Sequence, residues 1–278
     1  YGRSPRVGDV VSNFSDFISS SGGSASFPTI FLSKSQTWVP PQDGNIMIHL
    51  IGAGGGGACS SNWQTNRSGG GAGGYSRKNT LAVTTGGSFT LSLGAFGERG
   101  NYAIAENGSA GGNSTFSGTN LSTMTANGGA GGTGSASSGG TASGGSVNYT
   151  GGGSNAASGG GAIGLTGTGQ TMTGEWYGGW GARCDIIGDF WSSKMGQIAG
   201  GLPTQDYAST AYPVLAPPPA AGPLSGGAMV RSNGGYSSIR GGDASIGGGG
   251  GPGQGQGPES SYFGGRGGAA ICVIQYIP

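Results

Sequence analysis

The sequence has few charged side chains, one histidine and three cysteines. Charged residues make up 8% of the 278 residues, whereas ordinary domains carry roughly 25%. The surface must therefore consist largely of serine, threonine, asparagine and glycine, which is unusual for a cytosolic enzyme. Such a surface is typical of an extracellular or virion protein.

The charges that are present nearly cancel. The sequence has twelve Lys and Arg residues and eleven Asp and Glu residues, which gives a formal net charge of +1. Arg231, Arg240 and Arg266 lie in glycine-rich sequence that resembles RGG-type segments, but no basic stripe is available to follow a phosphate backbone. The balance of charge therefore argues against nucleic-acid binding.

Long apolar runs and a cysteine framework are also missing. No stretch approaches 18 consecutive apolar residues, so we expect no membrane insertion, and residues 1–6 lack the apolar run of a signal peptide. Tyr1 as the first residue suggests processing. Cys59, Cys184 and Cys272 are far apart and allow at most one internal disulfide. Cys272 lies in the apolar run 270–274 and is expected to be a buried, inert side chain.

Catalytic and cofactor motifs are weak. His49, the only histidine, lies in the alternating pattern of a predicted strand. This position is more typical of a hydrogen-bonded or exposed strand residue than of a member of a catalytic triad. Metal sites need three or four ligands at short spacing, which these cysteines and His49 do not supply. Gly52, Gly54 and Gly57 spell G-x-G-x-x-G after a predicted strand, but no helix and no acidic residue follow at the required distance. We therefore expect that the protein binds no metal ion and no cofactor and that it is not an enzyme.

Four carboxylates lie in one aromatic-rich segment: Glu175, Asp185, Asp189 and Asp206. Carboxylate pairs carry out glycoside hydrolysis in many enzymes. The same groups can bind sugar hydroxyls or cap turns, and the sequence leaves all three roles open.

Glycine is the dominant residue, at 69 of 278, and it occurs in blocks between apolar runs. The blocks are residues 52–57, 69–74, 128–134, 139–145, 151–161, 247–257 and 264–268. Collagen is excluded because the 13 prolines and the absence of a triplet register do not fit it. The blocks are either flexible linkers or extended helices of three residues per turn, packed side by side through backbone hydrogen bonds.

Period-two patterns predict strands beside these blocks. They cover residues 27–32, 37–39, 45–51, 79–84, 88–93, 114–116, 121–126 and 270–277. Gly86 and Gly87 predict a tight hairpin turn between two of these strands. We therefore expect an all-β fold.

The N-terminal segment, residues 1–35, has a different pattern. Apolar side chains recur at spacings of three and four, which predicts a short amphipathic helix. They are Val7, Val10, Val11, Phe14, Phe17 and Ile18. This stripe is a candidate attachment surface for a partner subunit, and the alternative is packing on its own domain.

Aromatic residues gather in residues 175–223: Trp176, Tyr177, Trp180, Phe190, Trp191, Tyr207 and Tyr212. Trp and Tyr rings suit recognition surfaces, so Trp176, Tyr177, Trp180 and Trp191 are the main receptor-binding candidates. Trp63 and Tyr102 lie on two other predicted loops and are further candidates. The alternative is that these rings cover the glycine tracts. Residues 212–223 are proline-rich and predict a stiff spacer.

Five blocks, in order, resemble the glycine-rich domain of bacteriophage tail fibres and tail-tip adhesins. They are residues 38–57, 69–93, 111–116 (GGNSTF), 125–132 (TANGGAGG) and 264–276 (GGRGGAAICVIQY). The resemblance covers most of residues 36–278, which we take as one domain. It does not cover residues 1–35 and 175–223.

The resemblance implies a small β framework linked by a bundle of polyglycine II helices, with variable loops at one end that contact the bacterial surface. The expected function is a non-catalytic tail-fibre adhesin of the virion that binds a surface glycan or outer-membrane protein. Its expected partners are another tail-fibre protein or further copies of itself. The alternative is a structural subunit of an extracellular filament or coat.

Overall fold

The computed structural model describes residues 27–60, 67–101, 106–155, 160–165, 167–169, 171, 241, 243–254 and 263–278. Within this part the chain forms two five-stranded antiparallel sheets and one two-stranded pair, and it contains no helix. The predicted all-β class is therefore confirmed for the described residues. No helix long and apolar enough to span a membrane occurs among them. The short N-terminal helix predicted before residue 27 lies outside the described residues.

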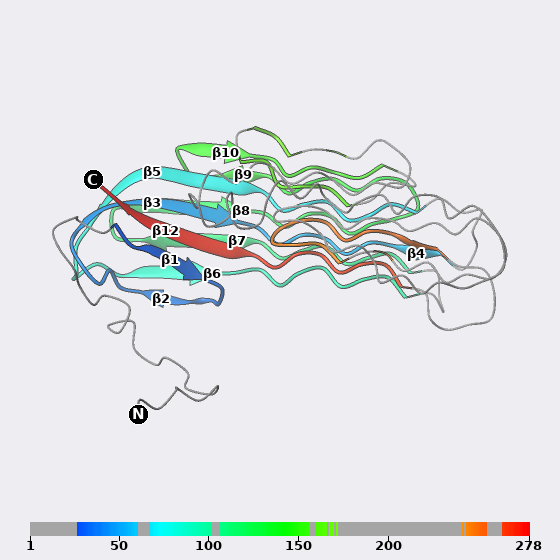
Figure 1. Cartoon of the computed structure of the whole chain (residues 1–278), viewed down its shortest axis with the longest axis horizontal. Coiled ribbons are helices and arrows are strands. Elements are labelled where there is room, and N and C mark those ends of the chain that lie inside the picture. The colour runs from blue at the N-terminus through cyan, green and yellow to red at the C-terminus, as the bar shows by residue number, and fades with distance from the viewer. Residues whose placement is uncertain are drawn as a thin grey trace, which may run out of the picture.

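The first sheet has the strand order β1, β12, β3, β5, β10, and all its neighbours are antiparallel. Its strands are β1 (Thr29–Leu32), β12 (Ile271–Ile277), β3 (Gly44–Ile51), β5 (Tyr75–Val83) and β10 (Val147–Tyr149). The register of β1 and β12 sets Thr29 opposite Gln275. The first described residues and the C-terminus therefore lie at the same end of the molecule (Figure 1).

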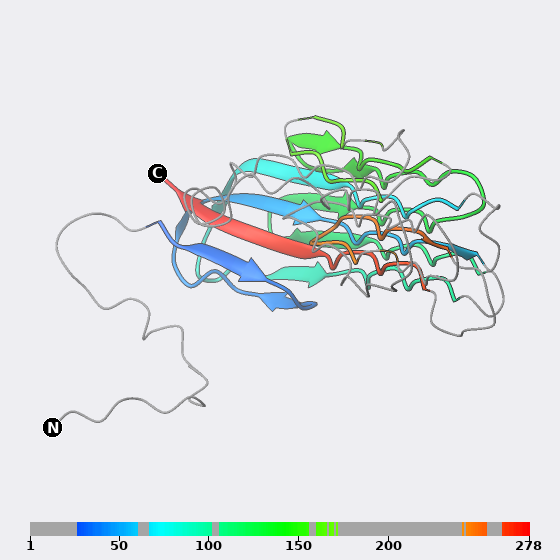
Figure 2. The same cartoon turned by 45° about the vertical axis from the view of Figure 1, so that its right-hand side comes forward.

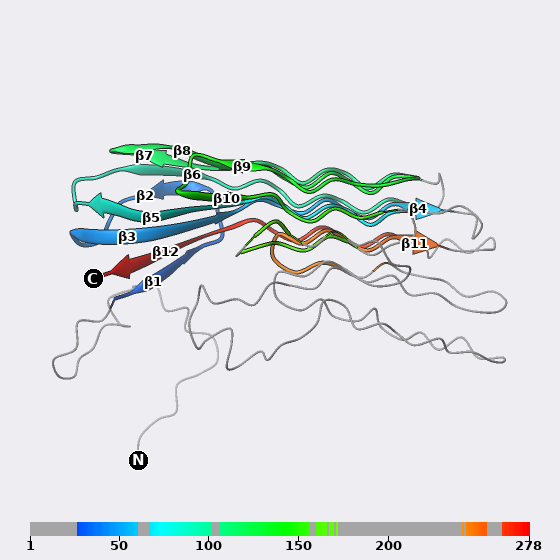
Figure 3. The same ribbon diagram turned by 90° about the horizontal axis from the view of Figure 1, so that it is seen from above.

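The second sheet has the strand order β2, β6, β7, β8, β9, again antiparallel. Its strands are β2 (Gln36–Trp38), β6 (Phe89–Ser92), β7 (Ser114–Gly118), β8 (Leu121–Ala126) and β9 (Ala142–Ser143). Figure 3 shows the two sheets as separate layers, with β7 and β8 in one layer and β3 and β12 in the other.

The core lies between the two sheets and is built from alternate residues of each strand. On β3, Ile46, Ile48 and Leu50 are fully buried, as their period-two pattern predicts. They face aromatic residues of the second sheet, where the rings of Phe89 and Phe116 stack at a centroid distance of 5.6 Å. Burial of these side chains provides the main apolar stabilisation of the sandwich.

All eight predicted strands are present, with ends shifted by a few residues, and four short strands were not predicted. The hairpin predicted at Gly86 and Gly87 is wrong in one respect. The turn exists, because the Gly87 N–H donates to the Thr84 carbonyl at 2.8 Å. However, β5 and β6 belong to different sheets, so the turn crosses the sandwich. Each strand pairs with other neighbours while its alternate apolar residues enter the shared core.

Glycine tracts continue the strands at the end of the sandwich away from the C-terminus (Figures 1 and 2). Residues 52–58 extend β3, and their backbone bonds recur at every third residue. The N–H groups of Gly52 and Gly55 donate to the carbonyls of Gly74 and Gly71, each at 2.9 Å. Ala58 then donates to Ser68 at 3.2 Å. The two tracts therefore run antiparallel without forming a β-ladder.

Residues 52–58 lie at the centre of the tracts. Their backbone groups, with the N–H of the adjoining Cys59, bond to six segments: 68–74, 97–100, 106–109, 129–132, 250–253 and 265–268. For example, Gly54 donates to Gly268 at 2.9 Å and accepts from Gly97 at 2.8 Å. Neighbouring tracts therefore satisfy the polar groups of a backbone that has almost no side chains.

Glycine is required at these positions because neighbouring backbones approach too closely for a side chain. A Cβ at Gly55 would overlap the carbonyl of Ala130, and one at Gly70 would overlap the carbonyl of Gly55. Gly249 is constrained in the same way by the carbonyl of Gly70. In the described tracts, the glycine blocks are therefore packed side by side and are not flexible linkers, which was the other alternative that the sequence left open.

Candidate functional site

The far end of the glycine tracts is the candidate functional site, because several chain connections gather there. The short strands β4 (Cys59–Ser60) and β11 (Gly253–Gln254) pair in parallel at this end (Figure 1). Asn101 forms a β-bridge with Phe263. The described residues that flank 61–66, 102–105 and 255–262 therefore lie together, opposite the C-terminus.

Polar side chains hold the backbone near this end. Ser137 Oγ donates to the carbonyl of Gly69 at 2.7 Å, in a buried position. Ser68 Oγ accepts from the Thr133 N–H at 2.9 Å. The guanidinium of Arg67 donates to Asn107 Oδ1 at 3.4 Å on the surface. Neighbouring tracts are thus joined by side chains as well as by backbone, which fixes the starting points of the end connections.

The predicted receptor-binding residues lie outside the described residues. Trp63 and Tyr102 fall in 61–66 and 102–105, whose flanking residues are at the far end. The others fall in 172–240: Trp176, Tyr177, Trp180 and Trp191. The carboxylates of that segment, Glu175, Asp185, Asp189 and Asp206, are also outside, as is Cys184.

The predicted attachment residues also lie outside the described residues, in 1–26. They are Val7, Val10, Val11, Phe14, Phe17 and Ile18. The segment next to them is described: β1 lies within 1–35 and pairs with β12 in the first sheet.

His49 is buried on β3, and both of its ring nitrogens are bonded. Its Nδ1 lies 2.7 Å from the Tyr75 hydroxyl, and its Nε2 lies 3.1 Å from Gln275 Oε1. Because the Gln275 oxygen can only accept, Nε2 carries the proton and Nδ1 accepts from Tyr75. Burial lowers the pKa of His49 from 6.5 to about 4, and the positive charge of Arg77 adds to this. The ring is therefore neutral at physiological pH and is a satisfied strand residue, one of the two roles expected for it.

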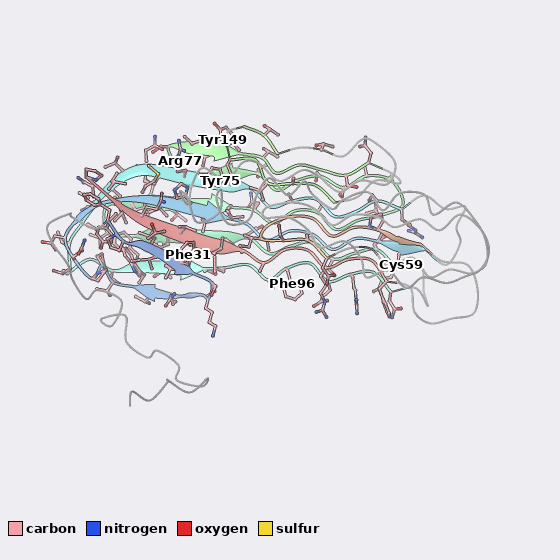
Figure 4. All side chains as sticks on the ribbon, viewed as in Figure 1. Phe31, Cys59, Tyr75, Arg77, Phe96 and Tyr149 are labelled. Carbon is pink, nitrogen blue, oxygen red and sulfur yellow. The ribbon has the colours of Figure 1, made fainter. Side chains whose placement is uncertain are left out.

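Tyr75 links His49 to a second apolar cluster beside the start of the tracts. Its ring stacks on those of His49 and Tyr149, at centroid distances of 6.1 and 6.2 Å. Figure 4 shows Tyr75 and Tyr149 next to each other. Ile51 and Ile163 belong to the same buried cluster as Tyr75. This cluster stabilises the junction between sheet and tracts and presents no open nucleophile.

Two of the cysteines and the G-x-G-x-x-G motif have structural roles. Cys59 and Cys272 are both buried, and burial raises the pKa of the Cys272 thiol above its ordinary value. Cβ atoms at Gly54 and Gly57 would overlap the carbonyls of Gly248 and Gly251, so packed backbone fills the space a dinucleotide would need. In the described part of the chain, no three His, Cys, Asp or Glu residues gather to hold a metal.

One cluster along the glycine tracts was missed by sequence reasoning: Phe96, Glu98, Arg99, Phe263 and Arg266. We call it the arginine band. The guanidinium carbon of Arg99 lies 4.4 Å from the ring centroid of Phe263. The sequence pattern that predicts this cluster was present: Phe96 and Arg99 are three positions apart in glycine-rich sequence, and so are Phe263 and Arg266. That spacing matches the recurrence of the backbone hydrogen bonds of these tracts at every third residue.

A search of curated proteins finds no match. A family model described as a glycine-rich domain matches residues 31–277, which is most of the chain. The matched range includes the second sheet, the first sheet except the start of β1, and the tracts that continue them. The chain therefore belongs to this glycine-rich domain family.

Proposed function

We propose that this protein is a non-catalytic bacteriophage tail-fibre adhesin that binds a receptor on the bacterial surface, a glycan or an outer-membrane protein. In this proposal the β-sandwich is the framework, and the glycine tracts are a bundle of polyglycine II helices. The connections at the far end of the bundle contact the receptor. The protein acts at the tail-fibre tip of the virion.

The observation that carries the proposal is the separation of the two ends. The C-terminus and the first described strand lie at the sandwich end, whereas the flanking residues of three connections lie at the other end. A rigid spacer between a framework and a set of variable loops suits a protein that must reach a surface and present side chains to it.

The hydrogen bonds of the tracts support the polyglycine II assignment. They recur every third residue and connect residues 52–58 to six neighbouring segments. An extended helix with three residues per turn has no internal hydrogen bonds and directs its backbone groups outward in three directions. Both parallel and antiparallel neighbours are then acceptable, and both occur around residues 52–58.

Adsorption to susceptible bacteria tests the proposal. The purified protein is expected to bind such cells and to compete with the phage that carries it. Substitution of Trp176, Tyr177, Trp180 and Trp191 together by Ala is expected to weaken adsorption strongly, since aromatic anchors commonly contribute about 2 kcal/mol or more each. The variant must melt like the parent. Unchanged adsorption would show that these rings are packing residues.

The place of the protein in the particle separates this proposal from the alternative, a structural subunit of an extracellular filament or coat. Antibody labelling is expected to find the protein at the tips of phage tail fibres. Isolation as a homopolymer without phage tails would contradict the adhesin proposal.

A further inference from the structure

The arginine band lies on two neighbouring antiparallel tracts, residues 94–101 and 263–270. Gly264 donates to the Gly100 carbonyl at 3.2 Å, and Gly267 donates to the Gly97 carbonyl at 3.0 Å. These four glycines are buried. Of the four positions one residue before them, 96, 99 and 266 are exposed and 263 is half-buried. The backbone register therefore places the long side chains of the two tracts together on the outer side of the bundle.

The antiparallel register pairs each arginine with a phenylalanine from the other tract. Arg99 stacks on Phe263 at 4.4 Å, and the Arg266 guanidinium carbon lies 5.7 Å from the ring centroid of Phe96. Phe96 keeps 38% of its surface exposed and lies on the edge of the tracts in Figure 4. A guanidinium that stacks on a ring loses part of its rotational freedom but keeps its N–H edge available.

The two arginines differ in their charge partners. Arg266 Nε lies 3.3 Å from Glu98 Oε2, and this is the ion pair found in the part of the chain that the structure describes. The nearby carboxylate of Asp243 accepts the backbone N–H of Arg266 at 2.7 Å. Arg99 has no carboxylate partner among the same residues. Among the described residues, Arg99 is therefore an exposed guanidinium that stacks on a ring and forms no ion pair.

We propose that the arginine band binds an anionic sugar, a pyranose that carries a carboxylate or phosphate group, as part of the surface receptor. This deepens the proposed function and rests on it. The planar fork of Arg99 matches the oxygens of a carboxylate or phosphate, which it binds through two parallel N–H donors. The exposed ring of Phe96 offers an apolar face to the sugar, and Glu98 offers an acceptor to its hydroxyls. The band therefore selects acidic surface glycans over neutral ones.

Titration of the full chain with defined oligosaccharides tests the proposal. The probes are tetragalacturonate for the carboxylate, a phosphorylated mannotetraose for the phosphate, maltotetraose as the neutral control and inorganic phosphate as the bare anion. At least one anionic oligosaccharide is expected to bind about tenfold or more tightly than maltotetraose, as expected for a charge-assisted hydrogen-bond pair. The better of the two anionic probes identifies the anionic group.

Two variants of Arg99 and one control variant test whether the oligosaccharide binds at the arginine band. Arg99→Gln is expected to abolish the preference for the anionic probe, and Arg99→Lys to leave a weaker preference because it keeps charge without the planar fork. Arg77→Gln, on β5 in the first sheet (Figure 4), is the matched control and should bind like the parent. Equal affinity for neutral and anionic probes, or a preference that survives Arg99→Gln, would overturn the proposal. Inorganic phosphate that competes as well as the oligosaccharide would overturn the sugar assignment.

Cell adsorption separates this proposal from the adhesin proposal. Loss of adsorption in Arg99→Gln supports both. If the parent adsorbs and Arg99→Gln adsorbs equally, the adhesin proposal stands and the arginine band is not part of its receptor site. If the parent does not adsorb to any susceptible host, the adhesin proposal fails, while the titration still decides whether the band binds anionic sugars.

Discussion

At the scale of single residues, the molecule depends on what a glycine lacks. A side chain at a packed tract position would overlap a neighbouring carbonyl, as at Gly249 against Gly70. Other glycines have open space: a Cβ at Gly134 would meet only the Arg67 guanidinium, at 3.7 Å. The sequence predicts the purpose of the glycines but not which of them are packed, because that depends on neighbours distant in sequence.

These two glycines form a matched pair for substitution. Gly249→Val is expected to reduce the free energy of unfolding by about 3 kcal/mol or more, since an inserted side chain must separate adjacent backbones. Gly134→Val should change it by less than about 1 kcal/mol, as is usual at exposed sites. Denaturant unfolding measures both, and equal effects would count against packed tracts.

His49 predicts a pH dependence of stability. Its pKa is about 4 in the folded protein and 6.5 as an unperturbed group, so the folded state disfavours the proton. The resulting stabilisation is complete above pH 6.5 and is lost as pH falls toward 4, because the unfolded chain binds the proton first. The shift corresponds to about 3 kcal/mol.

Urea unfolding at a series of pH values measures this contribution. The parent is expected to lose stability between pH 6.5 and 4, whereas His49→Gln, which cannot titrate, should show a flatter profile over that range. Identical slopes for parent and variant would assign the pH dependence to other groups.

At the scale of elements, strands were easier to predict than their partners. The period-two recurrence of Ile46, Ile48 and Leu50 identifies β3, and all three side chains are buried in the core. The Gly-Gly pair after β5 predicts a hairpin, but the structure has a crossing to the second sheet. The local chemistry of the pair is the same in both cases. Strand pairing is decided by the shared core and not by the turn.

Tract amides are expected to be protected from hydrogen exchange. The N–H groups of Gly55, Gly71 and Gly250 each donate to a carbonyl of another tract, so exchange requires opening of the bundle. The amide of Gly86, in the turn between the sheets, is the internal control and should exchange quickly. Exchange of all four at the rate of an unstructured chain would mean that the tracts are flexible linkers.

Deletion of residues 1–26 tests the attachment stripe predicted from the sequence. The truncated protein should fold, because β1 and both sheets begin after this segment, but it should no longer join the tail fibre. Circular dichroism and thermal melting check the fold, and recovery of the protein with assembled particles checks attachment. Normal incorporation would place attachment on another surface.

At the scale of the whole molecule, the described chain has two ends joined by glycine tracts. We call the end with the sandwich and the C-terminus the framework end, and the end with the residues that flank 61–66, 102–105 and 255–262 the loop end. The order of strand, glycine block and strand in the sequence indicates this arrangement in outline. It does not show which tract lies at the centre, because glycine blocks have no side chains that identify their neighbours. The arginine band was missed for a related reason: Phe96 and Phe263 are far apart in sequence and meet only through the antiparallel register of their tracts.

The central claim is that recognition takes place at the loop end, and adsorption to susceptible bacteria by variants at the two ends tests it most directly. Trp63→Ala and Tyr102→Ala are combined, in the two segments whose flanking residues lie at the far end. At the framework end, Phe27→Ala and Val39→Ala truncate exposed apolar side chains, 47% and 53% exposed, as the matched control. With all variants folded, the loop-end pair is expected to lower adsorption about tenfold or more, and the framework-end pair should adsorb like the parent. If only the framework-end pair loses adsorption, recognition takes place at the framework end, which would contradict the claim.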